Sequence, residues 1–174
     1  MRAWRRRIPD GRFGAAALTR GGVAPALIRF AAPADYDQWR SLWDGYNQFY
    51  GRSGATALPD DIIQTTWSRF FDPAEAMHCL VAEQDGRLLG LAHYMFHRSM
   101  IAIENVCYLQ DLFTVPDARG QGVGRALIAA VAKEARAANA SRLYWHTHET
   151  NVTAQALYDK LAEKTGFIVY KQQY

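Results

Sequence analysis

Residues 109–125, LQDLFTVPDARGQGVGR, decide the fold of this chain. The first half reads as a strand that ends at Pro116, the second half is rich in glycine, and an alanine-rich helical segment follows. A strand, a glycine loop and a helix in this order turn backbone N–H groups and a helix N-terminus toward a bound phosphate. Glycines omit side chains where the backbone must approach the anion, and they tolerate positive φ. The stretch therefore predicts an anion cradle, such as one for the pyrophosphate of a cofactor.

The spacing of the loop excludes two common nucleotide-binding motifs. A Walker A loop needs Lys followed by Ser or Thr after its last glycine, and this chain has Arg125-Ala126. A dinucleotide-binding fingerprint needs a glycine where Arg125 stands, and it belongs at the first strand of its fold. The present loop lies about two-thirds of the way along the chain. A connection that merely needs flexible residues before a helix would also fit the glycines taken alone.

Two linked patterns identify a family. Arg-x-x-Gly-x-Gly resembles the acetyl-CoA pyrophosphate loop of the GCN5-related N-acetyltransferases (GNAT), and the strand-like residues 143–147 precede a pattern that resembles the second half of the GNAT core. The resemblance covers roughly residues 26–174 and is closest to the fungal branch that acetylates histones, polyamines and D-amino acids. The matching residues are Arg119, Gly122 and Gly124 in the loop, and Asn151, Ala154, Leu157, Tyr158, Gly166 and Phe167 downstream.

The resemblance implies an α/β protein with the GNAT fold, a mixed central β-sheet flanked by helices in a single domain. The order of apolar runs agrees with it: a strand, two helices, three strands, a helix, a strand, a helix and a final strand. Asp85-Gly86 between two apolar runs predicts a hairpin. The expected elements are strands at 26–30, 77–83, 87–96, 109–116, 143–147 and 168–170, and helices at about 34–50, 59–70, 123–138 and 151–158.

Composition is that of one globular domain. The chain has 174 residues, of which 49% are hydrophobic and 13% aromatic, so a substantial core is possible. No apolar run approaches the length that spans a bilayer. Cys79 and Cys107 lie in strand-like runs without metal-ligand spacing, which favours buried thiols in a reducing compartment. We therefore expect a cytoplasmic protein that does not bind a membrane.

The positive charge belongs to the N-terminus. The formal net charge is +3, yet residues 1–20 hold six arginines and a single acidic residue, which leaves a balance of −2 for the remainder. We expect residues 1–25 to be a basic, poorly ordered extension and residues 26–174 to be the GNAT acetyltransferase domain. A mildly acidic domain argues against nucleic-acid binding. Gly11, Arg12 and Gly14 interrupt the apolar stretch that a secretory signal needs, while an arginine-rich transit peptide stays open.

The resemblance assigns acetyl-CoA, used as a co-substrate, to the glycine loop and its neighbours. Backbone groups around Leu112, Phe113 and Thr114 would pair with pantetheine as a strand does. Asn151 would contact the cofactor arm. The loop residues that would hold the pyrophosphate are Arg119, Gly120, Gln121, Gly122, Val123, Gly124 and Arg125.

The predicted catalytic residues are Tyr158 and Asp111. Tyr158 matches the family tyrosine that protonates the leaving thiolate, and a core tyrosine is its alternative. The polyamine-acetylating branch has Glu-Asp on the cofactor strand, whereas this chain has Gln110-Asp111. Gln110 cannot accept a proton at neutral pH. Asp111, Glu104 or Glu149 could act as the base, through water where needed, and the base is left open.

Histidines and aromatic residues supply further candidates near the acceptor. His93/His97 and His146/His148 form two pairs with even spacing, but no set of three ligands shows metal spacing, so no metal is expected. His146 or His148 could instead line the acceptor cleft. The aromatic residues of segment 34–50 recur at helical spacing. With Asp44, Asp60 and Asp61 nearby they would suit a cationic amine, although a core role for most of them is equally open.

These patterns predict an N-acetyltransferase that transfers the acetyl group of acetyl-CoA to a primary amine by direct attack in a ternary complex. The acceptor could be a small amine, an amino acid or a lysine side chain. The alternative is a non-catalytic acyl-CoA-binding module with the GNAT fold, which the missing glutamate at Gln110 supports and the retained Tyr158 opposes. Members of the fungal branch are oligomeric, so a homodimer is a further expectation.

Overall fold

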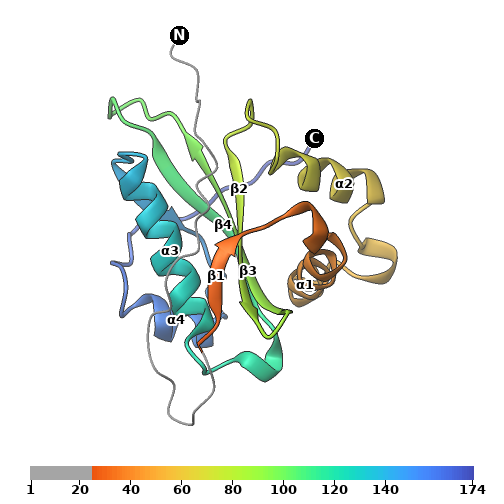
Figure 1. The fold of residues 1–174 in the computed structure, drawn as a ribbon. Coiled ribbons are helices and arrows are strands. Elements are labelled where there is room, and N and C mark those ends of the chain that lie inside the picture. Colours follow the sequence, from red (N-terminus) through yellow and green to blue (C-terminus); the bar gives the residue numbers. More distant parts are fainter. Residues whose placement is uncertain (1–24) are drawn as a thin grey trace.

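A five-stranded sheet forms the centre of the protein, whose computed structural model describes residues 25–174 (Figure 1). The strands lie in chain order, with β1 to β4 antiparallel and β5 parallel to β4. β5 is therefore an edge strand. The strands are β1 (Leu27–Phe30), β2 (Met77–Gln84), β3 (Arg87–His97), β4 (Val106–Thr114) and β5 (Arg142–Trp145).

Helices cover both faces of the sheet (Figure 1). α1 (Tyr36–Phe49) and α2 (Asp60–Arg69) lie on one face, and α3 (Val123–Ala137) and α4 (Val152–Tyr158) lie on the other. Short 3₁₀ segments at Pro33–Asp35, Gly54–Thr56 and Pro116–Ala118 connect them. This arrangement confirms the predicted mixed α/β fold with a single domain.

Two apolar layers hold the helices against the sheet. Leu80, Leu109 and Leu127 lie in the layer under α3, and Trp39 and Leu91 lie in the layer under α1 and α2. All five side chains are at most 2% exposed, and complete burial of side chains of this size is the main source of stability. Most of the aromatic residues of segment 34–50 therefore belong to the core, which is one of the two roles predicted for them.

The predicted hairpin turn is confirmed. Asp85 and Gly86 both have positive φ, at 51° and 78°, which is the geometry of a two-residue hairpin between β2 and β3. Asn139, with φ of 54°, follows the end of α3 as a left-handed cap.

The predicted closing strand at Ile168–Tyr170 is wrong. Residues 159–174 form no helix or strand, and the side chains of Phe167, Ile168 and Val169 are 93%, 74% and 69% exposed. β-propensity reflects packing on a half-buried sheet surface, and this segment has neither a ladder partner nor a buried face. Figure 1 shows it leaving α4, passing behind the sheet in this view and ending beside α2.

An irregularity in β4 positions the site. His93 pairs with Asp111 and Tyr94 pairs with Leu109, so Gln110 is the extra residue of a β-bulge. The ladder between β4 and β5 ends at the same level, at Leu109 and Trp145. Beyond this point β4 stays on β3, where a Cβ on Gly90 would lie 2.5 Å from the Phe113 carbonyl oxygen. β4 and β5 therefore separate from Gln110 onward.

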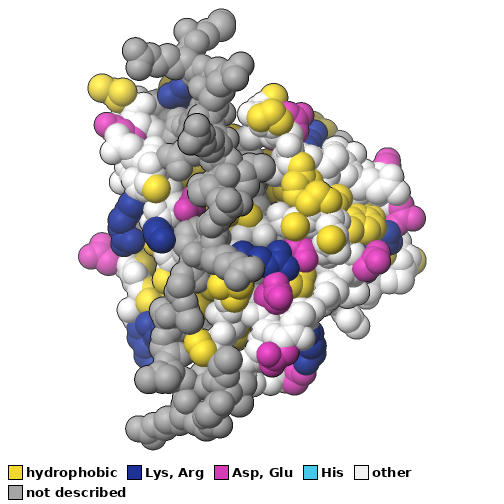
Figure 2. Space-filling model, viewed as in Figure 1, with side chains coloured by type: hydrophobic (Ala, Val, Ile, Leu, Met, Phe, Trp, Pro, Cys, Tyr) yellow, Lys and Arg dark blue, Asp and Glu magenta, His cyan; other side chains and the backbone are white. Residues whose placement is uncertain are grey.

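The surface and the termini complete the description. Figure 2 shows basic and acidic side chains interspersed on the described part of one face. No helix among residues 25–174 has the length and apolarity needed to cross a membrane. The predicted N-terminal extension, residues 1–25, lies outside the described residues except for Pro25.

Candidate functional site

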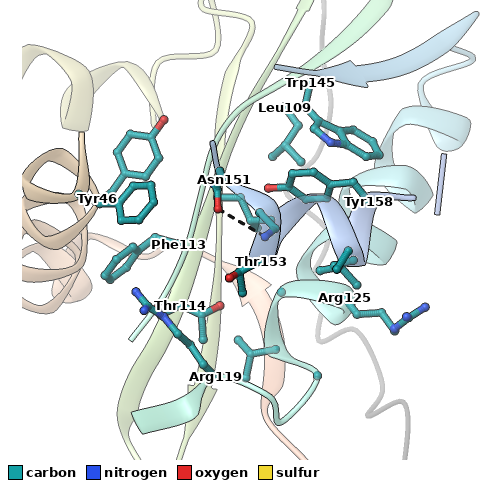
Figure 3. Close-up of a pocket in the computed structure, with 18 of the residues that line it drawn as sticks. Tyr46, Leu109, Phe113, Thr114, Arg119, Arg125, Trp145, Asn151, Thr153 and Tyr158 are labelled. Carbon is teal, nitrogen blue, oxygen red and sulfur yellow. Dashed lines mark hydrogen bonds between the residues drawn. The ribbon is translucent and has the colours of Figure 1, made fainter. Parts of the chain in front are cut away.

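A cavity of about 600 Å³ opens where β4 and β5 separate. Its walls come from α1, the outer edge of β4, the N-terminus of α3 and α4 (Figure 3). This volume is within the range of small-molecule and cofactor sites. One end lies at the glycine loop and the other at the aromatic residues of α1.

The glycine loop has the geometry of an anion cradle. Gly120 and Gly122 have φ of 77° and 86°, which L side chains rarely adopt. α3 begins directly after Gly122, and the N–H groups of its first turn have no partner within the helix. Arg119 and Arg125 border the same end of the cavity (Figure 3). The loop therefore concentrates positive potential at one end of the cavity.

Gly124 keeps this end open. A Cβ at this position would lie 3.6 Å from Leu157 Cδ2 and 3.8 Å from Thr114 Oγ1, which is ordinary contact distance. A small side chain would therefore fit, and a longer one would extend into the cavity. Gln121 is the one predicted loop residue outside the lining, because its Nε2 donates a hydrogen bond to the Asp117 carbonyl, 2.8 Å away.

The edge of β4 supplies the middle of the cavity. Leu112, Phe113 and Thr114 line it, and they lie beyond the end of the β4–β5 ladder. An unpaired strand edge presents alternating N–H and C=O groups. An extended ligand with amide groups can therefore pair with this edge as a strand would.

Asn151 lies at the cavity but has a structural role as well. It is the N-cap of α4, where its Oδ1 accepts a hydrogen bond from the Ala154 amide at 3.4 Å (Figure 3). Its Nδ2 donates to Thr147 Oγ1 at 3.3 Å. These two bonds orient the side chain, so any contact with a ligand uses its remaining hydrogen-bonding capacity.

Tyr158, the last residue of α4, lines the cavity. Its ring packs edge-on against Trp145, with centroids 5.4 Å apart. Burial raises the pKa of its hydroxyl to about 12, so the hydroxyl stays protonated at neutral pH. Tyr158 therefore packs against a neighbouring ring, as predicted for a core tyrosine, and its side chain also lines the cavity, as a group that contacts a ligand must.

The candidate bases are not in the cavity. Asp111 is 5% exposed and points under α1, where it contacts Trp43 and His93, while the neighbouring Gln110 lines the cavity. Glu104 and Glu149 also lie outside the lining. Among the described residues, no carboxylate lines this cavity. Asp111 can therefore act only through a neighbour, not by direct contact as a base.

Aromatic side chains form the other end of the cavity. Tyr46 and Phe49 of α1 and Tyr50, which directly follows the helix, line this end, and His146 lines the cavity as well. The Arg52 guanidinium lies 5.9 Å and 5.7 Å from the ring centroids of Tyr46 and Tyr50, within the range of cation–π contacts. A cation therefore stands beside this end of the cavity.

The acidic residues expected beside the stripe do not face this cavity. Asp44 and Asp60 lie 3.8 Å and 2.6 Å from Arg40 in ion pairs, both exposed, and Asp61 is outside the lining as well. The predicted acidic wall for a cationic amine is therefore wrong. These residues follow the helical spacing but face solvent.

The histidines separate into different environments. His93 is buried, His97 Nε2 lies 3.1 Å from the Tyr144 hydroxyl, and His148 Nδ1 lies 2.8 Å from Thr150 Oγ1. Only His146 lines the cavity, with Nδ1 3.4 Å from the Tyr108 hydroxyl. In the part of the chain that the structure describes, no group of three or more His, Cys, Asp or Glu residues could hold a metal ion.

Sequence reasoning missed the position of Arg52 and the partner of His93. Tyr46 belongs to the aromatic residues of segment 34–50, for which both an acceptor-side role and a core role are predicted. Arg52 lies in the loop after α1, where no periodicity applies. His93 was paired with His97 by its even spacing, and its true partner, Asp111, became visible only through the register of β3 and β4.

The sequence of this chain is similar to a known protein family and to individual members of it. A family model described as the acetyltransferase (GNAT) family matches residues 39–162. A D-amino-acid N-acetyltransferase of Saccharomyces cerevisiae is 34% identical over 148 residues, 84% of this chain and 89% of the relative. An aminoglycoside N(6′)-acetyltransferase of Stenotrophomonas maltophilia is 29% identical over 147 residues, 82% and 90% of the two chains.

Solved structures show the same fold. The aminoglycoside N-acetyltransferase AAC(6′)-Iy in complex with CoA superposes with a TM-score of 0.74 at 21% identity, over 90% of this chain and 99% of that one. The family match covers the loop, the β4 edge and the helix of Tyr158. The chain belongs to the acetyltransferase (GNAT) family and is an N-acetyltransferase that uses acetyl-CoA as its co-substrate.

Proposed function

We propose that the acceptor is an amino acid, a small primary amine that also carries a carboxylate, and that its amine attacks acetyl-CoA directly in a ternary complex. The setting of Arg52 carries this proposal. Its Nε donates to the Oδ1 of the buried Asn47 at 2.7 Å, which fixes the guanidinium beside the aromatic end of the cavity. No carboxylate lines this cavity among the described residues, so the end favours an anionic group over a second cation.

The relatives agree with this choice in part. The D-amino-acid N-acetyltransferase is named for an acceptor of this class, whereas the aminoglycoside enzyme is named for a different one. An aminoglycoside or a polyamine carries several positive charges, which Arg52 would repel. A lysine side chain carries a single positive charge, but in a protein the carboxyl group of that lysine is part of a peptide bond and carries no charge.

Each part of the cavity then has one task. The backbone amides of 120–125 hold the pyrophosphate with Arg119 and Arg125, and the edge of β4 pairs with pantetheine. The thioester would then lie between Gln110 and Tyr158. Such placement lowers the barrier mainly by holding the amine and the carbonyl carbon in contact.

The chemical step needs no cofactor beyond acetyl-CoA. The lone pair of the neutral amine forms the C–N bond at the thioester carbonyl carbon, and the C–S bond breaks with its electron pair on sulfur. The nitrogen then loses its extra proton to His146 or to water, because no carboxylate is in reach. The products are the acetylated amine and CoA.

Tyr158 is the proposed acid for the leaving sulfur. Its hydroxyl is protonated at neutral pH, since burial raises its pKa to about 12, and it lines the cavity beside Trp145. An ordinary thiol has a pKa of about 8.5, so a thiolate is a weaker base than the phenolate that Tyr158 becomes after it gives its proton to the sulfur. The phenolate therefore takes up a proton again. The proton that the amine releases balances this exchange.

The acyl-CoA-binding module without turnover, predicted as the alternative, is not supported, because the chain belongs to the acetyltransferase (GNAT) family and is an N-acetyltransferase. Gln110 faces the cavity where the polyamine-acetylating branch has a carboxylate. Release of free CoA thiol from acetyl-CoA on addition of an amine measures the turnover of the enzyme.

A homodimer and a cytoplasmic location are part of the same proposal. The outer edge of β5 is unpaired, and the C-terminal segment 167–170 is exposed and strand-forming in composition. A segment of this kind can complete the sheet of a second copy.

Cys79 and Cys107 are buried free thiols, which suits a reducing compartment. The basic residues before Gly21 are proposed to be dispensable for the acetyltransferase domain.

We expect Arg52→Gln to remove a preference for amino acids. Matched acceptor pairs, such as phenylalanine and phenethylamine, differ only in the carboxylate. For the amino acid kcat/KM should fall by about 10- to 100-fold, as for loss of a charge-assisted hydrogen bond, and for the amine by less than about threefold. Thiol release by wild type and variant measures both. Arg40→Gln, which removes an exposed cation elsewhere on α1, is the control, and equal rates of wild type on both acceptors would contradict the proposed acceptor.

We expect Gly124→Asp to weaken acetyl-CoA binding more than Gly124→Asn. Both side chains enter the cavity and have similar size, but only the carboxylate repels the pyrophosphate, at a cost of several kcal/mol between like charges. An acidic residue in the first turn of a helix is otherwise favourable, so the fold should persist. Titration calorimetry with acetyl-CoA should show at least about a tenfold difference in Kd. Equal affinities would remove the pyrophosphate from this loop.

We expect Tyr158→Phe to lower kcat by about 10²-fold or more, the usual effect of losing a positioned acid. The affinity for acetyl-CoA should change little, because the ring and its contact with Trp145 remain. Single-turnover thiol release isolates the chemical step. Tyr36→Phe, on α1 and away from the cavity, controls for the loss of a hydroxyl. A variant with full single-turnover rate would leave protonation of the thiolate to solvent.

We expect the protein to be a dimer in solution and Val169→Asp to convert it to a monomer. Val152→Asp is the matched control, because Val152 is also 69% exposed but lies at the start of α4. A charge within the pairing segment should weaken association by at least about tenfold, and sedimentation equilibrium gives the mass of each variant. A wild-type protein that is monomeric at assay concentrations would contradict the homodimer.

A further inference from the structure

Asp111 is a buried carboxylate whose charge no lysine or arginine neutralises among the described residues. Its Oδ2 lies 2.9 Å from His93 Nδ1 and 3.3 Å from Trp43 Nε1, and the Tyr46 hydroxyl interacts with the same carboxylate. The residue is 5% exposed. Burying a carboxylate in this way is costly unless donors surround it. Here His93, Trp43 and Tyr46 supply the surrounding donor groups.

His93 contributes a hydrogen bond and no charge. Trp39 Nε1 lies 2.8 Å from His93 Nε2, and an indole nitrogen can only donate. Nε2 must therefore be the accepting, unprotonated nitrogen, which places the ring proton on Nδ1, facing Asp111. A second proton on His93 would set two donors against each other. The cluster of Trp39, His93 and Asp111 thus keeps one negative charge.

Tyr46 connects this charge to the cavity. An ionised carboxylate accepts only, so the Tyr46 hydroxyl donates its hydrogen to Asp111, and its oxygen lone pairs stay free. Burial and the charge of Asp111 raise the pKa of Tyr46 well above its ordinary value, so the hydroxyl keeps this hydrogen. The same side chain lines the cavity on the wall opposite Tyr158 (Figure 3).

We propose that Tyr46 binds the acceptor nitrogen: its hydroxyl oxygen accepts a hydrogen bond from an N–H of the amine, and Asp111 behind it stabilises positive charge there. When the amine lone pair forms the C–N bond, the carbonyl π pair moves to oxygen and the nitrogen becomes positive. A fixed negative charge one hydrogen bond away favours that state over the neutral amine. Tyr46 touches the substrate, whereas Asp111, His93 and Trp39 are positioning residues.

This role differs from that of a general base. Three donors hold the pKa of Asp111 below its ordinary value although burial alone would raise it, so it is a poor proton acceptor at neutral pH. Its side chain also lies behind Tyr46 rather than in the cavity. The proton therefore leaves the nitrogen by another route, and Asp111 stays charged throughout the step.

Tyr46→Phe tests the inference, with Tyr36→Phe on the same helix as its control. For the primary amine that wild type acetylates fastest, kcat/KM for the acceptor should fall by about 10- to 100-fold in Tyr46→Phe and by less than about twofold in the control. The Kd for acetyl-CoA should change by less than about twofold, because backbone groups at the other end of the cavity hold the cofactor. A retained kcat/KM for the acceptor, or a loss of acetyl-CoA affinity large enough to account for the fall, would overturn the inference.

Asp111→Asn and the double variant separate positioning from packing. If Asp111 acts through Tyr46, the double variant should lose no more than the larger single loss, whereas independent roles would multiply. Multiplied losses would overturn the link. Should Asp111→Asn fail to fold, Tyr46→Phe still decides the question. The inference rests on the proposed acceptor end of the cavity but not on the amino-acid acceptor, since an active amine lacking a carboxylate would disprove only the latter.

Discussion

The separation of β4 from β5 at Gln110 is the constraint on which the site depends. The bulge inserts one residue opposite β3 and reverses which side of the strand faces which layer. Leu109 therefore packs under α3 and Asp111 under α1, although the two are only two residues apart. The same point ends the ladder to β5, so the exposed edge of β4, the loop and α4 can surround a ligand. The cavity lies where the sheet is not continuous between β4 and β5.

Charge is distributed along the cavity in a way that matches the proposed reactants. The glycine loop and the α3 N-terminus present donors to an anion at one end. At the other end the Tyr46 hydroxyl lies beside the buried carboxylate of Asp111, and the Arg52 guanidinium lies near the aromatic ring of Tyr46. An amino acid with its amine toward Tyr46 and its carboxylate toward Arg52 would complement both groups. Burial strengthens the interaction at Tyr46 relative to water, whereas Arg52 is exposed.

Local signals in the sequence predicted much of the fold and the cofactor end, because they depend on backbone conformation. Glycines at positive φ, the Asp85-Gly86 turn and the order of apolar runs are all read within a few residues. Three features depended on distant pairing instead. The direction of Asp111 follows from register with β3, and the neutral state of His93 follows from Trp39. Residues 168–170 form no strand because they have no ladder partner and stay exposed. Propensity alone describes none of these.

In the proposed function the two ends of the cavity differ in what holds the ligand. The cofactor end works through backbone groups, so it tolerates most changes that leave the glycines and the helix start in place. The proposed acceptor end relies instead on the side chains of Tyr46, Arg52 and His146, on a helix, a loop and the segment after β5. A substitution there is expected to change which amine fits without moving the thioester. The buried cluster behind Tyr46 is the exception, because it lies in the packed layer between α1 and the sheet and is coupled to stability as well as to the acceptor.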